Sequence, residues 1–226
     1  MKWIVKLLGV LVLLALPVTA QDHAPLPEGL VEFENAKIDF AALRPGVDWA
    51  KYKTIMLYEL AVTPAARDAT PEHSSTRRYA GESWVLRDKD IKLMQEEFAK
   101  VMEKELPKGG FSFVTEPQAD TLIIVPTIID IYLTAPIEDT RRTNMSRGAT
   151  YTEGAGALTI AVILADGETL EVVAEGVDQR YPSSSNMWKE NTRVFNIGDM
   201  RSIFRAWGKM MRKRLPDFAS GKIETP

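Results

Sequence analysis

The sequence predicts one exported α+β domain, a two-layer sandwich in which two amphipathic helices cover one face of a mainly antiparallel sheet of about five strands. Three observations support this fold class. The N-terminus has the form of an export signal, residues 88–106 and 197–215 carry apolar side chains at helical spacing, and runs rich in β-formers lie between them. The expected order is a strand, a long loop, a helix, four strands and a helix.

The first twenty residues have the three parts of a secretory signal. Lys2 and Lys6 supply positive charge, residues 7–16 form an unbroken apolar run, and the small residues of VTA at 18–20 suit signal peptidase. A transmembrane helix needs about 20 apolar residues, so this run is short for a span. We therefore predict cleavage between Ala20 and Gln21, and a retained N-terminal anchor is the alternative.

The chain contains no cysteine. A bacterial lipoprotein carries its lipid on a cysteine directly after the cleavage site, where this chain has Gln21. Lipid attachment by that route and disulfide bonds are both excluded, so we expect a periplasmic or secreted protein without a lipid anchor. The net charge is −3, and removal of a signal with two lysines and no acid lowers it to −5. This acidity argues against nucleic acid as a partner.

The remaining chain is expected to form a single domain. Residues 21–36 mix prolines and acids and are interpreted as a mobile lead-in; the domain then covers residues 37–217, and 218–226 form a C-terminal tail. The first predicted strand is 52–60 (YKTIMLYEL). A polar loop over 61–86 follows, longer than a compact domain usually contains without a functional reason.

Two amphipathic helices are predicted. In the first, over 88–106, apolar residues recur every three or four positions, Asp88 is the expected cap, and Pro107 with two glycines ends it. In the second, over 197–215, the apolar stripe includes Phe204 and Trp207, and Pro216 is expected to stop the helix. Burial of each large side chain in these stripes is worth ~1.5–3 kcal/mol, so we expect the second helix to close the core.

The strands between the helices include the most apolar segment of the domain. Residues 111–115 predict a short strand, and 120–133 (DTLIIVPTIIDIYL) are apolar on both faces, as in a central strand. Pro126 conflicts with that position because it has no N–H for the ladder, so we expect a bulge or break there. Residues 157–165 and 169–181 flank Asp166-Gly167, a strong hairpin signal.

No catalytic set is recognisable. The two histidines, His23 and His73, have no cysteine or further histidine at metal-ligand spacing, and no G-x-S-x-G motif occurs. The glycine-rich residues 148–157 lack the G-K-[ST] ending of a phosphate loop. We therefore predict a protein that is not an enzyme and has no cofactor or metal. The alternative is a hydrolase-like enzyme built from loop residues, and its candidates are His73, Arg77, Glu82 and Arg142.

Candidate partner contacts lie in two loops. Residues 181–196 (YPSSSNMWKENTRVFN) place Met187 and Trp188 among polar residues, and Trp84 ends the other long loop. An exposed tryptophan beside a methionine is typical of a partner site. In the alternative interpretation, Trp188 folds back over the edge of the core. The predicted partner is an envelope protein or another envelope component.

Three segments resemble a known family. They are residues 48–55 (DWAKYKTI), 117–122 (PQADTL) and 204–215 (FRAWGKMMRKRL). Together and in this order they are similar to domain-of-unknown-function family 3313, a bacterial group of lipoprotein-like envelope proteins, over residues 30 to 217. The resemblance implies export and residence in the envelope, and it carries no established activity. Gln21 departs from the lipoprotein pattern.

Overall fold

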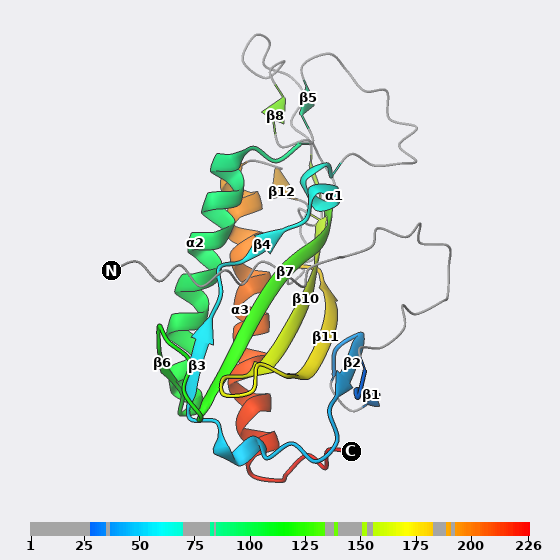
Figure 1. Cartoon of the computed structure of the whole chain (residues 1–226). Coiled ribbons are helices and arrows are strands. Elements are labelled where there is room, and N and C mark those ends of the chain that lie inside the picture. Colours follow the sequence, from blue (N-terminus) through cyan, green and yellow to red (C-terminus); the bar gives the residue numbers. More distant parts are fainter. Residues whose placement is uncertain are drawn as a thin grey trace.

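The computed structural model in Figure 1 shows a mixed α+β fold, which confirms the predicted class. Two long helices, α2 (Asp88–Glu105) and α3 (Arg193–Ala219), run side by side against one face of an open sheet. The described residues also contain a short helix, α1 (Pro64–Arg67), and the 3-10 turns η2 (Trp49–Lys51) and η3 (Leu106–Gly109). The structure describes residues 28–34, 37–69, 82–83, 85–133, 138–139, 151–152, 156–182, 189–190 and 193–226.

The sheet has eight strands, not the predicted five or so. Its order is β1 (Val31–Glu32), β2 (Phe40–Leu43), β11 (Val172–Arg180), β10 (Gly156–Asp166), β7 (Thr121–Leu133), β3 (Thr54–Leu57) and β6 (Ser112–Phe113), with β4 (Ala61–Val62) also on β7. Two separate pairs are β5 (Glu82–Ser83) with β8 (Glu138–Asp139) and β9 (Tyr151–Thr152) with β12 (Lys189–Glu190). The additional strands of the sheet have two to four residues, too few for a period-2 signal.

The sheet is antiparallel only on one side of β7. The pairs from β1 through β2, β11 and β10 to β7 are antiparallel, whereas β3 pairs with β7 and β6 in parallel and β4 pairs with β7 in parallel. Parallel neighbours need a crossover, and α2 provides it between β3 and β7. The prediction of a mainly antiparallel sheet therefore holds for the long strands and is wrong for this side.

Pro126 lies inside a continuous strand, so the predicted break there is wrong. β7 runs unbroken from Thr121 to Leu133, and Pro126 pairs with Val162 of β10. The backbone N–H of Tyr58 bonds to the carbonyl of Ile124, and the N–H of Thr63 bonds to that of Ile128. Alternation places the Pro126 nitrogen on the same side, between these two contacts, where no ladder bond is required. The register shift lies between Ile128 and Asp130 instead.

Helix α2 has the predicted position, but its cap differs. Arg87, not Asp88, precedes the helix, and the Asp90 carboxylate accepts the backbone N–H of Arg87 at 3.1 Å. Met94, Phe98, Val101 and Met102 are buried, as the periodicity indicates. The acidic first turn thus satisfies one of the free N–H groups at the helix start.

Helix α3 passes through Pro216, so the prediction that this proline stops the helix is wrong. A proline inside a helix removes the bond to the carbonyl four residues earlier, here that of Arg212. Gly109 packs closely against this carbonyl: a Cβ at Gly109 would lie 2.9 Å from the Arg212 oxygen. Beyond the proline, the Phe218 ring stacks on Trp49 with centroids 5.1 Å apart. This packing offsets the cost of the lost hydrogen bond.

The core lies between the sheet and the two helices. Phe98 of α2 meets Phe204 of α3 edge to face at 5.4 Å, and Phe204 stacks on Trp207. Trp207 is 1% exposed, and its Nε1 donates to the buried Asp178 of β11 at 2.7 Å. The predicted apolar stripe of α3 therefore closes the core.

Candidate functional site

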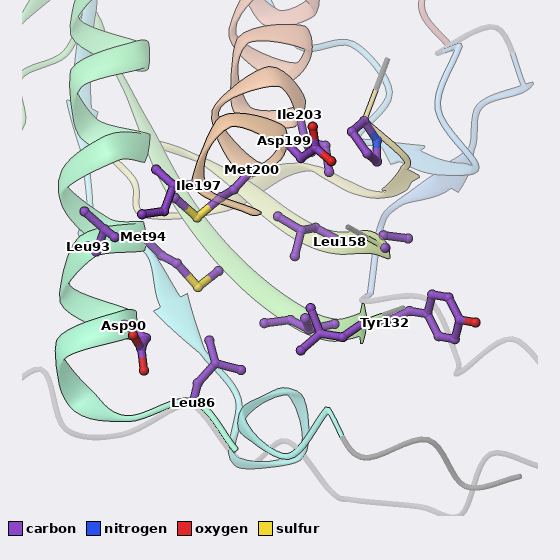
Figure 2. A pocket seen from close by; sticks show the side chains of 15 residues that line it. Leu86, Asp90, Leu93, Met94, Tyr132, Leu158, Ile197, Asp199, Met200 and Ile203 are labelled. Carbon is purple, nitrogen blue, oxygen red and sulfur yellow. The ribbon is translucent and has the colours of Figure 1, made fainter. Parts of the chain in front are cut away.

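An apolar cavity of about 120 Å³ opens where α2 and α3 begin. We call it the Met94–Met200 pocket, after the methionines that reach it from the two helices. Figure 2 shows both side chains between the helices, while Tyr132 points away from them. The described lining residues are Leu86, Asp90, Leu93, Met94, Ile131, Tyr132, Leu133, Gly156, Ala157, Leu158, Pro182, Ile197, Asp199, Met200 and Ile203.

The pocket exists because five elements end or begin at this place. α2 and α3 contribute their first turns, β7 its last residues, β10 its first residues, and the chain after β11 contributes Pro182. The helices lie side by side, so their apolar stripes face one another and the strand ends form the floor. Met94 is buried and Met200 is half-buried. The wall is therefore mainly aliphatic, and each helix adds one flexible, polarizable methionine to it.

The chemistry of the pocket suits binding better than bond breaking. Asp90 and Asp199 are the ionisable groups among the lining residues that can be charged at neutral pH. Asp90 is already engaged by Arg87, whose backbone N–H lies 3.1 Å and whose Nε lies 3.5 Å from its Oδ2. The lining residues that the structure describes include no serine, histidine, lysine or arginine. Apart from the two carboxylates, they offer no side chain that commonly acts as a base or a nucleophile.

A carboxylate with a strongly lowered pKa, that of Glu97, lies outside the pocket and joins the two helices. Glu97 of α2 is buried and forms two contacts with Arg201 of α3, Nε to Oε2 at 2.5 Å and Nη2 to Oε1 at 2.9 Å. The Arg201 hydrogen bonds, with a further one from Lys100, lower the pKa of Glu97 to about 2. The same pairing raises the pKa of Arg201. These charges hold α2 against α3.

A second buried carboxylate, Asp166, closes the β10–β11 hairpin. Its Oδ1 accepts the backbone N–H groups of Glu168 and Thr169 at 2.9 and 3.0 Å, and its Oδ2 accepts the Tyr52 hydroxyl at 2.8 Å. Lys51 forms an ion pair with the same oxygen. Burial alone would raise the pKa of Asp166, but these hydrogen bonds outweigh it and hold the pKa well below its usual range. Burial, followed by the bond to Asp166, raises the pKa of Tyr52. Both groups have a structural role.

The candidate residues from the sequence are not among the residues that line the described pocket. Trp84, Met187 and Trp188 lie outside the described residues, as do Ala20 and Gln21 of the expected cleavage site. In sequence, Trp84 is two positions before Leu86, and the Met187–Trp188 pair is five positions after Pro182, both of which line the pocket.

Most residues of the alternative enzyme site also lie outside the part of the chain that the structure describes. His73, Arg77 and Arg142 are not described, and of Glu82 the structure gives the backbone, in β5. Within the described part of the chain, no group of three or more His, Cys, Asp or Glu side chains is arranged to hold a metal ion. No helix there is long and apolar enough to cross a bilayer.

Sequence reasoning did not find the pocket itself. Met94 and Met200 both belong to helical stripes that were assigned to the core. Periodicity identifies the apolar face of a helix but does not distinguish its packed part from a part that borders a cavity. Methionines also occur in the later halves of both helices, so composition gives no signal for the pocket either.

The model of the family described as "Protein of unknown function (DUF3313)" matches residues 30–211. The chain belongs to the DUF3313 family. This match confirms the resemblance drawn from the three sequence segments. No curated protein matches this DUF3313 member.

Several solved structures resemble this DUF3313 protein at low identity. A PelC variant dodecamer from Paraburkholderia phytofirmans has a TM-score of 0.40 and 10% identity, and the match covers 77% of this chain and 97% of that one. A Xanthomonas campestris protein of family DUF330 has a TM-score of 0.42 and 9% identity over 81% and 94% of the chains. A DUF4136 protein from Bacteroides thetaiotaomicron has a TM-score of 0.34 and 11% identity over 84% and 98%. We draw no functional conclusion from these likenesses.

Proposed function

We propose that this DUF3313 protein is an exported, non-enzymatic protein of the cell envelope that binds a partner protein, and that the Met94–Met200 pocket receives an apolar side chain of that partner. The observation that carries the proposal is an apolar cavity bounded by two helix starts, to which each helix contributes one methionine. Methionine-lined surfaces adapt to apolar groups of different shape, which suits recognition of a protein segment.

The size of the pocket favours a side chain over a whole small molecule. An apolar cavity of about 150 Å³ binds benzene, so one of about 120 Å³ admits a group of similar size, such as an aromatic ring or a leucine side chain. Sites for drug-sized ligands and cofactors have ~300–1,000 Å³. In the same proposal, Trp84, Met187 and Trp188 contact the partner around the pocket, since their loops adjoin it in sequence.

Site-directed photocrosslinking tests the binding site. A benzophenone amino acid at Leu93, a half-buried lining residue, is expected to give one discrete crosslinked product in the native envelope. The matched control is the same amino acid at Tyr58, which is 46% exposed and remote from the lining. Equal products from both positions, or none from Leu93, would contradict the proposal.

A variant with a side chain of similar size but different polarity provides a second measurement. Leu93→Gln makes the wall polar, and we expect the crosslink from a probe at Ile197 on the opposite helix to decrease at least fivefold. Ile91→Gln changes another half-buried residue of α2 that does not line the pocket, and should leave the crosslink unchanged. The hydrolase-like alternative predicts instead a turnover activity that His73→Ala abolishes and Leu93→Gln does not.

Export is tested by the mass of the mature protein. We expect exported material to begin at Gln21 and to carry no lipid, because the chain has small residues before that position and no cysteine. Intact-mass measurement of the purified protein distinguishes the outcomes. A mass that includes residues 1–20, or an increment of lipid size, would show that the protein is anchored.

A further inference from the structure

Apart from the Met94–Met200 pocket, the core contains a cavity that lies next to a surface hollow rich in cations. The cavity, which we call the Trp207 cavity, has about 110 Å³ between α3 and strands β2, β10 and β11. Its wall includes Ile38, Ala41, Val162, Trp207 and Met210. The surface hollow, which we call the basic hollow, has about 570 Å³ and lies beside the C-terminal half of α3. Met210 and Arg214 line both, so the two spaces adjoin.

The basic hollow concentrates positive charge in a chain whose net charge is −3. Its charged lining residues are Lys37, Arg180, Lys213, Arg214, Lys222 and Asp217. Lys213 and Arg214 lie before the last turn of α3, so an interaction with the helix dipole, which acts within that turn, does not account for them. Lys37 precedes β2, Arg180 ends β11, and Lys222 follows α3. Cations from separate elements thus converge on one hollow.

Several of these cations are partly neutralised, and two are not. Arg180 bonds to Asp178 through Nε at 2.5 Å, and Lys222 pairs with Asp217 at 3.4 Å. Among the described residues, no carboxylate forms an ion pair with Lys37 or Lys213. Lys37 also has a φ of 59°, a left-handed conformation that is uncommon outside glycine and costs energy. The hollow therefore keeps a positive charge for an external anion.

The Trp207 cavity complements this charge with an apolar space. Gly176 forms part of its wall, and a Cβ there would lie 2.8 Å from the Ile38 Cδ1, so the glycine leaves room for the Ile38 side chain in this apolar wall. The buried Asp178 is already satisfied by Trp207 and Arg180. Arg180 links the spaces, since its Nη2 lies 3.8 Å from the Met210 sulfur. An apolar group in the cavity would meet mainly hydrocarbon and sulfur.

We propose that the Trp207 cavity and the basic hollow together bind an anionic single-chain amphiphile, with its alkyl chain in the cavity and its phosphate or carboxylate in the hollow. By comparison with the ~150 Å³ that holds the six carbons of benzene, the cavity takes about four methylenes. Each buried methylene strengthens binding about fourfold, so affinity rises with chain length until the cavity is full. This site is independent of the Met94–Met200 pocket.

Titration calorimetry of the full exported protein tests the ligand class with defined probes. We expect octyl phosphate, below its micellar concentration, to bind with one-to-one stoichiometry and at least tenfold more tightly than inorganic phosphate. Butyl phosphate, whose four carbons already fill the cavity, should bind nearly as tightly as octyl phosphate. Octyl glucoside, which has the same chain and no charge, should bind at least tenfold more weakly than octyl phosphate.

Two sets of variants locate the site. Lys37→Gln with Lys213→Gln should weaken octyl phosphate binding about tenfold without altering the melting temperature, because neither lysine has an ion-pair partner in the described structure. Lys53→Gln with Lys209→Gln removes the same charge from exposed positions outside the hollow and should change affinity less than twofold. Val162→Phe fills the cavity, and should abolish the gain from the alkyl chain while preserving phosphate binding.

Each contrary outcome overturns the proposal. Equal affinity for phosphate and octyl phosphate would show a simple anion site, and equal affinity for octyl glucoside would show non-specific detergent binding. If the hollow variant behaves like its control, or no probe binds, the site does not exist. Binding to phosphatidylglycerol vesicles that octyl phosphate does not compete for would assign the cations to a membrane surface instead. Should Val162→Phe fail to fold, the lysine variants still decide.

Discussion

Replacing Trp207 with alanine is expected to lower the free energy of unfolding by ~3–5 kcal/mol, out of ~5–15 kcal/mol for a whole domain. The substitution removes a side chain that is 1% exposed and stacks on Phe204. It also removes the hydrogen bond that Trp207 Nε1 donates to the buried Asp178. Urea melts of the exported protein measure the change.

Two further variants separate these contributions. Trp207→Phe keeps most of the packing and loses the hydrogen bond to Asp178, so we expect a loss of ~1–3 kcal/mol. Arg205→Ala lies on the same helix at an exposed position and should stay within ~0.5 kcal/mol. If Trp207→Ala proved as mild as Arg205→Ala, α3 would not close the core in solution.

Replacing Asp166 with alanine is expected to cost at least ~2 kcal/mol, because a buried hydroxyl and two backbone N–H groups lose their acceptor. These donors belong to Tyr52, Glu168 and Thr169 and connect the hairpin to the chain entering β3. Glu168→Gln, in the same turn and exposed, is the matched control and should be nearly neutral. Equal urea midpoints for the two variants would contradict this role of Asp166.

The contribution of the Asp166 charge to the free energy of unfolding should depend on pH in a defined direction. The pKa of Asp166 is lower in the folded protein than its usual value of about 4, so the folded state favours the ionised carboxylate. The stability from that charge is present above about pH 4 and is lost as the pH falls toward the folded pKa. The advantage of the native chain over Asp166→Asn should therefore be largest near pH 7 and shrink in urea melts at pH 3. A constant difference would show that the charge has no effect on stability.

The sequence predicts best those elements that are long and whose apolar pattern lies within one continuous segment. Residues 88–106 and 120–133 have many apolar positions, and α2 and β7 begin and end within one residue of those bounds. Pro216 misled the prediction, because the packing of Phe218 on Trp49 is a contact between distant parts of the chain. The strands β1, β2 and β4 are defined by their partners rather than by a pattern of their own.

The cavities were beyond sequence reasoning for a related reason. The Met94–Met200 pocket needs the ends of five elements, and the basic hollow needs Lys37, Arg180 and Lys213, which are far apart in sequence. Composition shows a mildly acidic chain and conceals a local excess of cations. Charge clustering of this kind becomes visible when the topology is known.

The short strands at the borders of the sheet limit how another polypeptide can attach. β1 and β6 are the outer strands, and each has two residues. A peptide that joins a sheet by main-chain hydrogen bonds needs a longer row of free N–H and C=O groups, as does edge-to-edge aggregation. Along the described sheet, an incoming chain finds almost no template for strand addition. The proposed partner would then be recognised through side chains, and its binding would be more sensitive to single substitutions than backbone pairing is.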